Sequence, residues 1–142
     1  MISHPEVVTE LIGGRRTETQ TIECESSRDE VVGLLVEASR IPEWAPAFVD
    51  KVTGDPASGW RATKDGQDFA LRVVVHEACG TVDYLREIAP EREGGAYLRT
   101  VPRPGGGSVI GMTVPVRDGD RPGTAATLAQ ELNALVALVK SF

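Results

Sequence analysis

The sequence has few of the residues on which metal, redox and nucleophilic sites are built. It contains two histidines, His4 and His76, and two cysteines, Cys24 and Cys79, and none of them has the spacing of metal ligands. No phosphate-binding loop ending in Gly-Lys and Ser or Thr is present, and no dinucleotide fingerprint lies between a strand and a helix. The sequence therefore predicts no catalytic motif, no metal and no cofactor.

Long apolar runs, clustered positive charge and aromatic residues are also scarce. No run approaches the roughly 18–20 apolar residues that cross a bilayer, so no membrane span is expected. A net charge of −6 and an aromatic content of 5% argue against nucleic acid as a partner, because such binding needs clustered basic residues and stacking rings. The N-terminus lacks a basic region followed by an apolar stretch, and the cysteines are not paired in the sequence, which favours a cytoplasmic protein.

The chain has the length and composition of one globular domain. Its 142 residues are 41% hydrophobic and 25% charged, which is enough to bury a core. Residues 1–16 are an arm of uncertain structure, for which a short helix, a loose arm and an added strand are all compatible. A single domain is expected over residues 17–142.

Strand-like segments separated by turn residues dominate the chain up to residue 116. The first is expected at residues 19–25, where alternation puts Gln20, Ile22 and Cys24 on one face. Six more strands are expected at residues 48–53, 60–64, 69–76, 81–88, 96–101 and 108–116.

Helical periodicity appears after the first strand and at the C-terminus. Ser27 and Glu30 form a capping box before an apolar stripe, and a short second helix between Pro42 and Pro46 centres on Trp44. The last helix is expected over residues 124–142 after a cap at 122–124. Its apolar face carries Leu128, Leu132, Leu135, Val136, Val139 and Phe142. Its polar face carries Gln130, Glu131, Asn133, Lys140 and Ser141.

Several local motifs occur in a recognisable order. They are the Ser-Ser-Arg-Asp-Glu-Val-Val helix start, Ile-Pro-Glu-Trp-Ala-Pro at 41–46, Gly-Thr-Val-Asp-Tyr-Leu at 80–85, the Gly-Gly-Ser turn and the C-terminal helix. This order resembles the START/polyketide-cyclase-like superfamily, also called SRPBCC or helix-grip proteins. The resemblance implies an α+β fold, with a seven-stranded antiparallel sheet wrapped around a long C-terminal helix. It also implies a deep cavity for lipids, polyketides, sterols or other apolar ligands.

The hairpin between residues 69 and 88 predicts which side chains line that cavity. If residues 77–80 form its loop, Val73 pairs with Tyr84, and one face is apolar apart from Tyr84 and Arg86. Arg86 could reach the rim, pair with an internal acid, or await an anionic or carbonyl-bearing ligand. Tyr84 could be a hydrogen-bonding handle or ordinary packing. The inward residues are Phe69, Leu71, Val73, Val75, Val82, Tyr84, Arg86 and Ile88.

The same logic extends to the later strands. Ile110, Met112 and Val114 are expected to face inward on the last strand, and Tyr97, Arg99 and Val101 join them if the Pro-rich turn keeps register. Trp44 closes one end of the core or contacts a ligand. The predicted ligand-binding residues are Trp44, Leu71, Val73, Tyr84, Arg86, Arg99, Met112 and Leu132.

Three functions are compatible with this pattern. The first is a carrier or sensor that binds a small hydrophobic, lipid- or polyketide-like molecule in the cavity. The second is a cyclase- or dehydratase-type enzyme that uses Tyr84, Arg86 and Arg99. The third is a co-chaperone-like interaction domain with a filled interior, hinted at by Val74 and Leu85 on the outer face, which could equally mark a homodimer surface.

Overall fold

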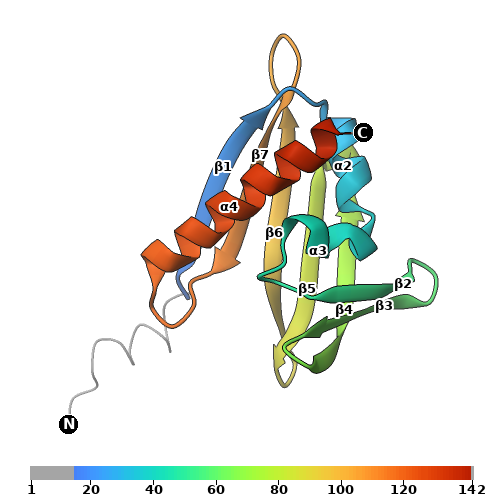
Figure 1. Cartoon of the computed structure of the whole chain (residues 1–142), viewed down its shortest axis with the longest axis vertical. Helices are drawn as coiled ribbons and strands as arrows, with labels where there is room; N and C mark the ends of the chain where they lie inside the picture. The colour runs from blue at the N-terminus through green and yellow to red at the C-terminus, as the bar shows by residue number, and fades with distance from the viewer. Residues whose placement is uncertain (1–14, 142) are drawn as a thin grey trace.

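A computed structural model describes residues 15–141, which form one curved sheet with three helices packed on its concave side (Figure 1). The strands are β1 (Thr17–Cys24), β2 (Lys51–Asp55), β3 (Gly59–Lys64), β4 (Gln67–His76), β5 (Thr81–Ala89), β6 (Arg92–Pro102) and β7 (Ser108–Pro115). The helices are α2 (Arg28–Leu35), α3 (Ile41–Trp44) and α4 (Arg121–Lys140), with 3-10 turns η1 (Ala38–Arg40) and η2 (Glu77–Cys79). Of the predicted arm, only Arg15 and Arg16 lie within the described residues. No helix in residues 15–141 is long and apolar enough to span a membrane.

Strands β2 to β7 form an antiparallel meander, and β1 pairs with β7. The order is β1-β7-β6-β5-β4-β3-β2, so β1 and β2 form the two edges. The long helix α4 crosses in front of the sheet and contacts β1, β7, α2 and α3. This arrangement confirms the predicted α+β architecture, in which a seven-stranded sheet wraps around the C-terminal helix.

The predicted capping box holds the start of α2. The Ser27 hydroxyl accepts a hydrogen bond from the Glu30 amide at 3.1 Å, and the Glu30 carboxylate accepts one from the Ser27 amide at 2.9 Å. Two N–H groups that a helix leaves unpaired at its start are thereby satisfied. Both hydrogen bonds hold the pKa of the Glu30 carboxyl below its usual value, and the bond from the Ser27 backbone amide has the larger effect. The capped helix turns Val31 and Leu34 toward the sheet, where both are buried.

Helix α4 begins earlier than its apolar pattern predicts. Its cap is Asp120, whose carboxylate accepts a hydrogen bond from the Gly123 amide at 2.9 Å, with Pro122 in the first turn. The predicted cap at 122–124 is therefore wrong, because the aspartate supplies the acceptor before the proline. Thr124 instead donates its hydroxyl hydrogen bond to the carbonyl of Asp120 at 2.7 Å.

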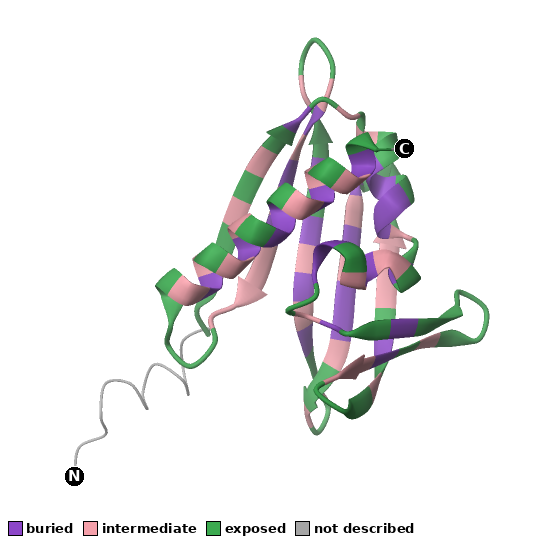
Figure 2. Ribbon diagram, in the orientation of Figure 1, coloured by how far each residue is buried: buried purple, intermediate pink, exposed green. Residues whose placement is uncertain are grey.

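The predicted register between β4 and β5 is confirmed. Val73 pairs with Tyr84, Val75 with Val82, and His76 with Thr81. Paired residues share a face of an antiparallel sheet, so the valines and Tyr84 face the helices. Figure 2 shows the resulting band of buried residues along the central strands and the inner side of α4.

The register between β6 and β7 reverses the predicted faces of β6. Leu98 pairs with Met112 and Thr100 with Ile110, so Leu98 and Thr100 share the inner face with these residues of β7. A β-bulge at Ile88, where the pairing of β5 and β6 shifts between Glu87 and Ala89, agrees with this register and leaves Tyr84 opposite Ala96. The inward placement expected for Tyr97, Arg99 and Val101 is therefore wrong. The residues buried on the inner face are Ala96, Leu98 and Thr100.

Strand β4 changes partners at its midpoint. Residues 67–71 pair with β3, whereas residues 72–76 pair with β5. In Figure 1, β2 and β3 accordingly turn away from the other strands and cross below α3. No strand among the described residues pairs with the outer side of residues 72–76, so this half of β4 is an open edge.

Candidate functional site

A cavity of about 650 Å³ lies between the inner face of the sheet, α3 and the first half of α4. Its wall combines apolar side chains with charged and hydroxyl-bearing ones from β3, the turn after β3, β5, α4 and the segment before α4. The apolar wall includes Trp44, Phe48, Tyr84, Ala96, Met112, Val114 and Leu128. Besides Tyr84, the side chains with charged or hydroxyl groups are Lys64, Asp65, Arg86, Arg117, Asp118, Asp120, Thr124, Thr127 and Glu131.

Arg86 is the cationic group that the inner face of the sheet supplies. Its guanidinium carbon lies over the Phe69 ring, 3.7 Å from the ring centroid, in a cation–π contact. Its Nε atom is buried and has no hydrogen-bond partner among the described residues. Gly94 pairs with Arg86, and the space that a side chain at Gly94 would take is occupied by the Ile88 side chain. A buried donor without an acceptor is costly, so this atom indicates a missing partner.

Glu131 is the buried acidic group of the same cavity, whereas Asp65, Asp118 and Asp120 in its wall are exposed. Only 8% of Glu131 is exposed, and this burial raises the pKa of its carboxyl to about 7, against a smaller lowering effect of Arg117. No residue in the described part of the chain forms a hydrogen bond or ion pair with it. Near neutral pH the carboxyl is thus present in both protonation states and can donate or accept a proton.

The prediction that Glu131 lies on the polar face of the last helix is wrong. Its position, three residues after Leu128 and four before Leu135, is part of the apolar stripe. The spacing alone could have placed it inside, whereas its charge suggested solvent. Arg117 and Phe48 had no comparable signal, since each comes from a connecting segment.

Tyr84 and Trp44 form the inner end of the cavity. The Tyr84 hydroxyl donates a hydrogen bond to the carbonyl of Leu35 at 2.6 Å, and its ring centroid lies 6.1 Å from that of Trp44. Burial raises the pKa of the Tyr84 phenol, so the group remains neutral. The hydroxyl is therefore engaged with the last turn of α2, and Tyr84 offers the cavity its ring. Trp44 is 2% exposed and both closes the core and lines the cavity.

The other predicted ligand-binding residues are divided among several regions. Met112 lines the cavity, and Leu132 is buried in the core outside its wall. Leu71 and Val73 line a separate groove at β4. Arg99 lies on the outer face, where its guanidinium donates a hydrogen bond to the Asp83 carboxylate at 2.6 Å.

Comparison with solved structures identifies the architecture. No family model and no curated protein sequence matches the chain. A START superfamily protein from Mycobacterium smegmatis superposes with a TM-score of 0.64 and 14% identity, over 90% of this chain and 99% of that one. The Zhui aromatase/cyclase from a Streptomyces species gives 0.62 and 16%, over 89% and 94%. Truncated norcoclaurine synthase from Thalictrum flavum gives 0.64 and 15%, over 89% and 94%.

The chain has a START-like helix-grip fold. At these identities the likeness shows the fold and leaves the activity open. In this helix-grip fold the cavity lies where the sheet and α4 enclose it, as the sequence resemblance implied.

A second hollow of the helix-grip fold, about 1050 Å³, follows strand β4. We call it the β4 groove. The wall of the groove includes Phe69, and the guanidinium of Arg86, which lines the cavity, lies over the Phe69 ring. The stacked pair therefore stands between the two hollows. The groove is lined by Val36, Trp60, Phe69, Leu71, Val73, Val75 and Leu85, and by polar residues that include Arg72, Glu77, Glu87, Glu91, Arg92 and Glu93.

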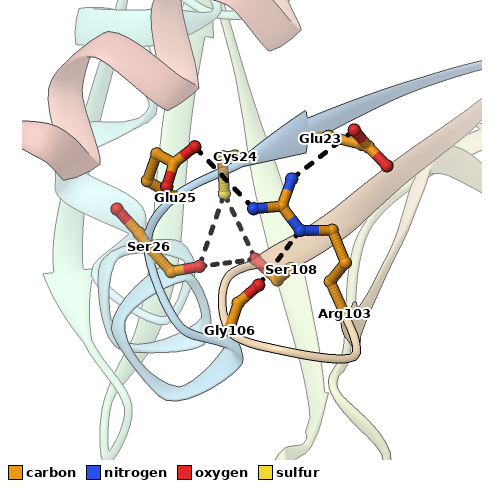
Figure 3. A network of polar contacts seen from close by, with 7 residues as sticks. All are labelled: Glu23, Cys24, Glu25, Ser26, Arg103, Gly106 and Ser108. Carbon is orange, nitrogen blue, oxygen red and sulfur yellow. Dashed lines mark hydrogen bonds and ion pairs between the residues drawn. The ribbon is translucent and has the colours of Figure 1, made fainter.

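A polar cluster at the far end of the sheet has a structural role (Figure 3). Arg103 hydrogen-bonds the carbonyl of Gly106 at 3.0 Å and reaches Glu23 and Glu25 at 3.5 and 3.7 Å. Beside it, Cys24 Sγ lies 3.2 Å from Ser108 Oγ. These contacts join the β6–β7 loop to the end of β1. Within residues 15–141, no group of three His, Cys, Asp or Glu side chains could hold a metal ion.

Proposed function

We propose that the protein binds a small, mainly apolar molecule in the cavity beneath α4, with the ligand's polar end between Arg86 and Glu131. The observation that carries this proposal is the buried Nε of Arg86, which has no acceptor within the described residues and belongs to a side chain that lines the cavity. An acceptor on the ligand, such as a carboxylate, phenolate or carbonyl oxygen, would satisfy it.

The size and wall of the cavity support this assignment. Its volume of about 650 Å³ falls in the range of roughly 300–1,000 Å³ found for small-molecule sites. Burying about 200 Å² of apolar ligand surface would contribute about 5 kcal/mol before the cost of immobilising the ligand. The apolar wall would thus supply most of the affinity, and Arg86 and Glu131 would select the ligand's polar end.

The fold's solved neighbours agree with a small-molecule role. Two of them are named as an aromatase/cyclase and a norcoclaurine synthase, and a third as a START superfamily protein. A carrier or sensor of a lipid- or polyketide-like molecule fits this setting. A cytoplasmic location and a homodimer remain predictions from the sequence.

An enzyme of the cyclase or dehydratase type is the second candidate. The specific observation in its favour is Glu131, whose carboxyl has a pKa of about 7 and shares the cavity with Arg86. Glu131 could move a proton near neutral pH, while Arg86 stabilises a developing oxyanion. Of the residues predicted for this role from the sequence, Tyr84 and Arg86 line the cavity, whereas Arg99 lies on the outer face. A co-chaperone-like domain with a filled interior is not favoured, because the interior holds a cavity.

A matched pair of dyes tests the binding proposal. 1-Anilinonaphthalene-8-sulfonate is an apolar aromatic with an anionic group, and N-phenyl-1-naphthylamine is the same skeleton without the sulfonate. We expect both to bind with one site per chain, and the sulfonate to bind more tightly because Arg86 lacks an acceptor. Nitrogen-15 chemical shifts of the Ala96, Val114 and Leu128 amides should locate the bound dye in the cavity.

Arg86→Met should weaken sulfonate binding about tenfold and leave the neutral dye unchanged, since a hydrogen bond to a charged group is worth about 1.5–3 kcal/mol. Arg72→Met, which removes an arginine from the outer face of β4, is the control and should change neither affinity. If neither dye shifts the cavity amides, the proposed function is wrong. If Arg86→Met binds both dyes as the parent chain does, Arg86 has no part in recognition.

A further inference from the structure

Strand β1, at one edge of the sheet, and the open side of β4 at residues 72–76 are protected to different degrees. Strand β1 forms one edge with polar side chains, and Arg103 and Arg121 reach across to Glu23 and Glu18 on it. Such charged, bridged side chains discourage pairing with another chain. The outer half of β4, residues 72–76, has no comparable cover from the described residues.

The exposed half of β4 is apolar where edge strands are normally charged. Val73, Val74 and Val75 are consecutive and all half-buried, and Val73 and Val75 line the β4 groove. The groove is lined from both faces of the strand, since Val75 lies on the inner face while Arg72 and Leu85 pair on the outer face. The hollow therefore follows the edge of β4, where an incoming strand would place its own side chains on both sides.

The rim of the β4 groove is acidic. Four glutamates border it, Glu77, Glu87, Glu91 and Glu93, against two arginines, Arg72 and Arg92. Arg72 is already engaged, because its guanidinium makes two hydrogen bonds with the Glu93 carboxylate at 2.6 and 3.0 Å. A basic segment would find unpaired carboxylates here. A second copy of the chain would bring a like-charged rim against this one, in a protein of net charge −6.

We propose that the β4 groove binds an extended segment of another protein, with alternating basic and apolar side chains, which adds a strand to the open edge of β4. The backbone N–H and C=O groups on the free side of residues 72–76 would form the ladder, and five residues span about 17 Å. Apolar side chains of the segment would pack against Val73 and Val75 in the groove. Its basic side chains would reach the glutamates of the rim. This site is separate from the cavity, so it stands or falls independently of the proposed ligand.

The probe is acetyl-Lys-Val-Lys-Val-Lys-Val-amide, titrated into the nitrogen-15-labelled full chain. We expect saturable chemical-shift changes at the amides of Val73, Val74 and Val75, with the cavity amides of Val114 and Leu128 unchanged. The same peptide N-methylated at alternate backbone amides keeps its side chains but cannot complete the ladder. It should bind about tenfold more weakly, because at least one or two backbone hydrogen bonds are lost.

Charge reversal on the rim separates this groove from general attraction to an acidic protein. Glu87→Lys should weaken peptide binding about three- to fivefold, the range of an exposed ion pair changed in place. Glu25→Lys alters the net charge equally at the far edge of the sheet and should leave the affinity within about 1.5-fold at moderate salt.

Three results would overturn the proposal. The first is equal binding of the N-methylated peptide, which would show that no strand is added. The second is an equal effect of the two charge reversals. The third is a concentration-dependent dimer whose contacts map to residues 72–76, which would make a second copy the occupant.

Discussion

The cavity beneath α4 is walled by side chains that also build the core, whereas the β4 groove borders a strand edge that the fold leaves unpaired. In the cavity, burial raises the pKa of Glu131, and Arg86 has a donor without an acceptor. In the groove, charges are exposed and partly paired with one another, as Arg72 is with Glu93. The proposed small molecule would therefore meet buried groups in the cavity, and the proposed strand would meet exposed ones at the groove.

The largest expected difference between the two regions is in stability. Leu132→Ala, in the core beside the cavity, should lower the free energy of unfolding by about 2–5 kcal/mol, because a leucine that is 1% exposed leaves a void. Val75→Ala in the groove should cost only about 1 kcal/mol, since the side chain is already half-exposed. Urea unfolding of both variants with unchanged m-values would measure this. Equal losses would mean that the groove is as much part of the core as the cavity wall.

The change of stability with pH should have opposite signs for Glu131 in the cavity and for a carboxyl on the rim of the β4 groove. The Glu131 carboxyl has a pKa of about 7 in the folded chain against 4.5 ordinarily, so the folded state binds more protons between these values. Stability must therefore fall as pH rises from about 4.5 to 7 and remain lower above that, by about 3 kcal/mol. Glu131→Gln should remove this dependence, which urea unfolding at pH 5 and pH 8 would reveal.

Glu93 on the groove rim is the control for that titration. The Arg72 guanidinium holds the pKa of the Glu93 carboxyl below its usual value, so its contribution is present at neutral pH and is lost as the solution is acidified. Glu93→Gln should thus lower stability at pH 7 more than at pH 4. If both glutamate variants changed the pH profile in the same direction, the contrast between buried and paired carboxyls would be wrong.

The parts of the fold that could be predicted from the sequence are those that local patterns determine. The Ser27–Glu30 box and the Val73–Tyr84 pairing follow from residues close together in the chain, and both were correct. The register of β6 against β7 could not be predicted, because a Pro- and Gly-rich turn is compatible with either register. The inward position predicted for Arg99 is wrong because Leu98, and not Arg99, pairs with Met112.

The candidate site was predictable only in part for a related reason. Strand alternation places Arg86, Tyr84 and Met112, the two prolines place Trp44, and all four line the cavity. Glu131 was missed because its charge outweighed its position in the apolar stripe, although buried charged groups tend to mark functional sites. The open edge of β4 exists because β3 pairs only with residues 67–71, and no local sequence pattern predicts where that pairing ends.

Removing the Tyr84 hydroxyl should separate stability from recognition within the cavity. Tyr84→Phe leaves the buried carbonyl of Leu35 without its donor, which should cost about 1–3 kcal/mol. The ring remains in the wall, so the affinity for 1-anilinonaphthalene-8-sulfonate should change less than twofold. Thermal or urea unfolding and dye titration on the same variant would measure both quantities. A large loss of dye affinity with unchanged stability would instead make the hydroxyl a ligand contact.

The smallest effect is expected at the rim of the groove. The Arg72–Glu93 pair has good geometry, at 2.6 Å, but its side chains are 59% and 43% exposed. Water screens such pairs, so a double-mutant cycle with Arg72→Met and Glu93→Gln should give a coupling energy under about 1 kcal/mol that shrinks further in high salt. A coupling energy of several kcal/mol would mean that the pair makes a large contribution to the stability of the fold. A small coupling energy would fit the proposed role of the groove. If Glu93 is held only weakly by Arg72, a basic side chain of an added strand could replace Arg72 at little cost.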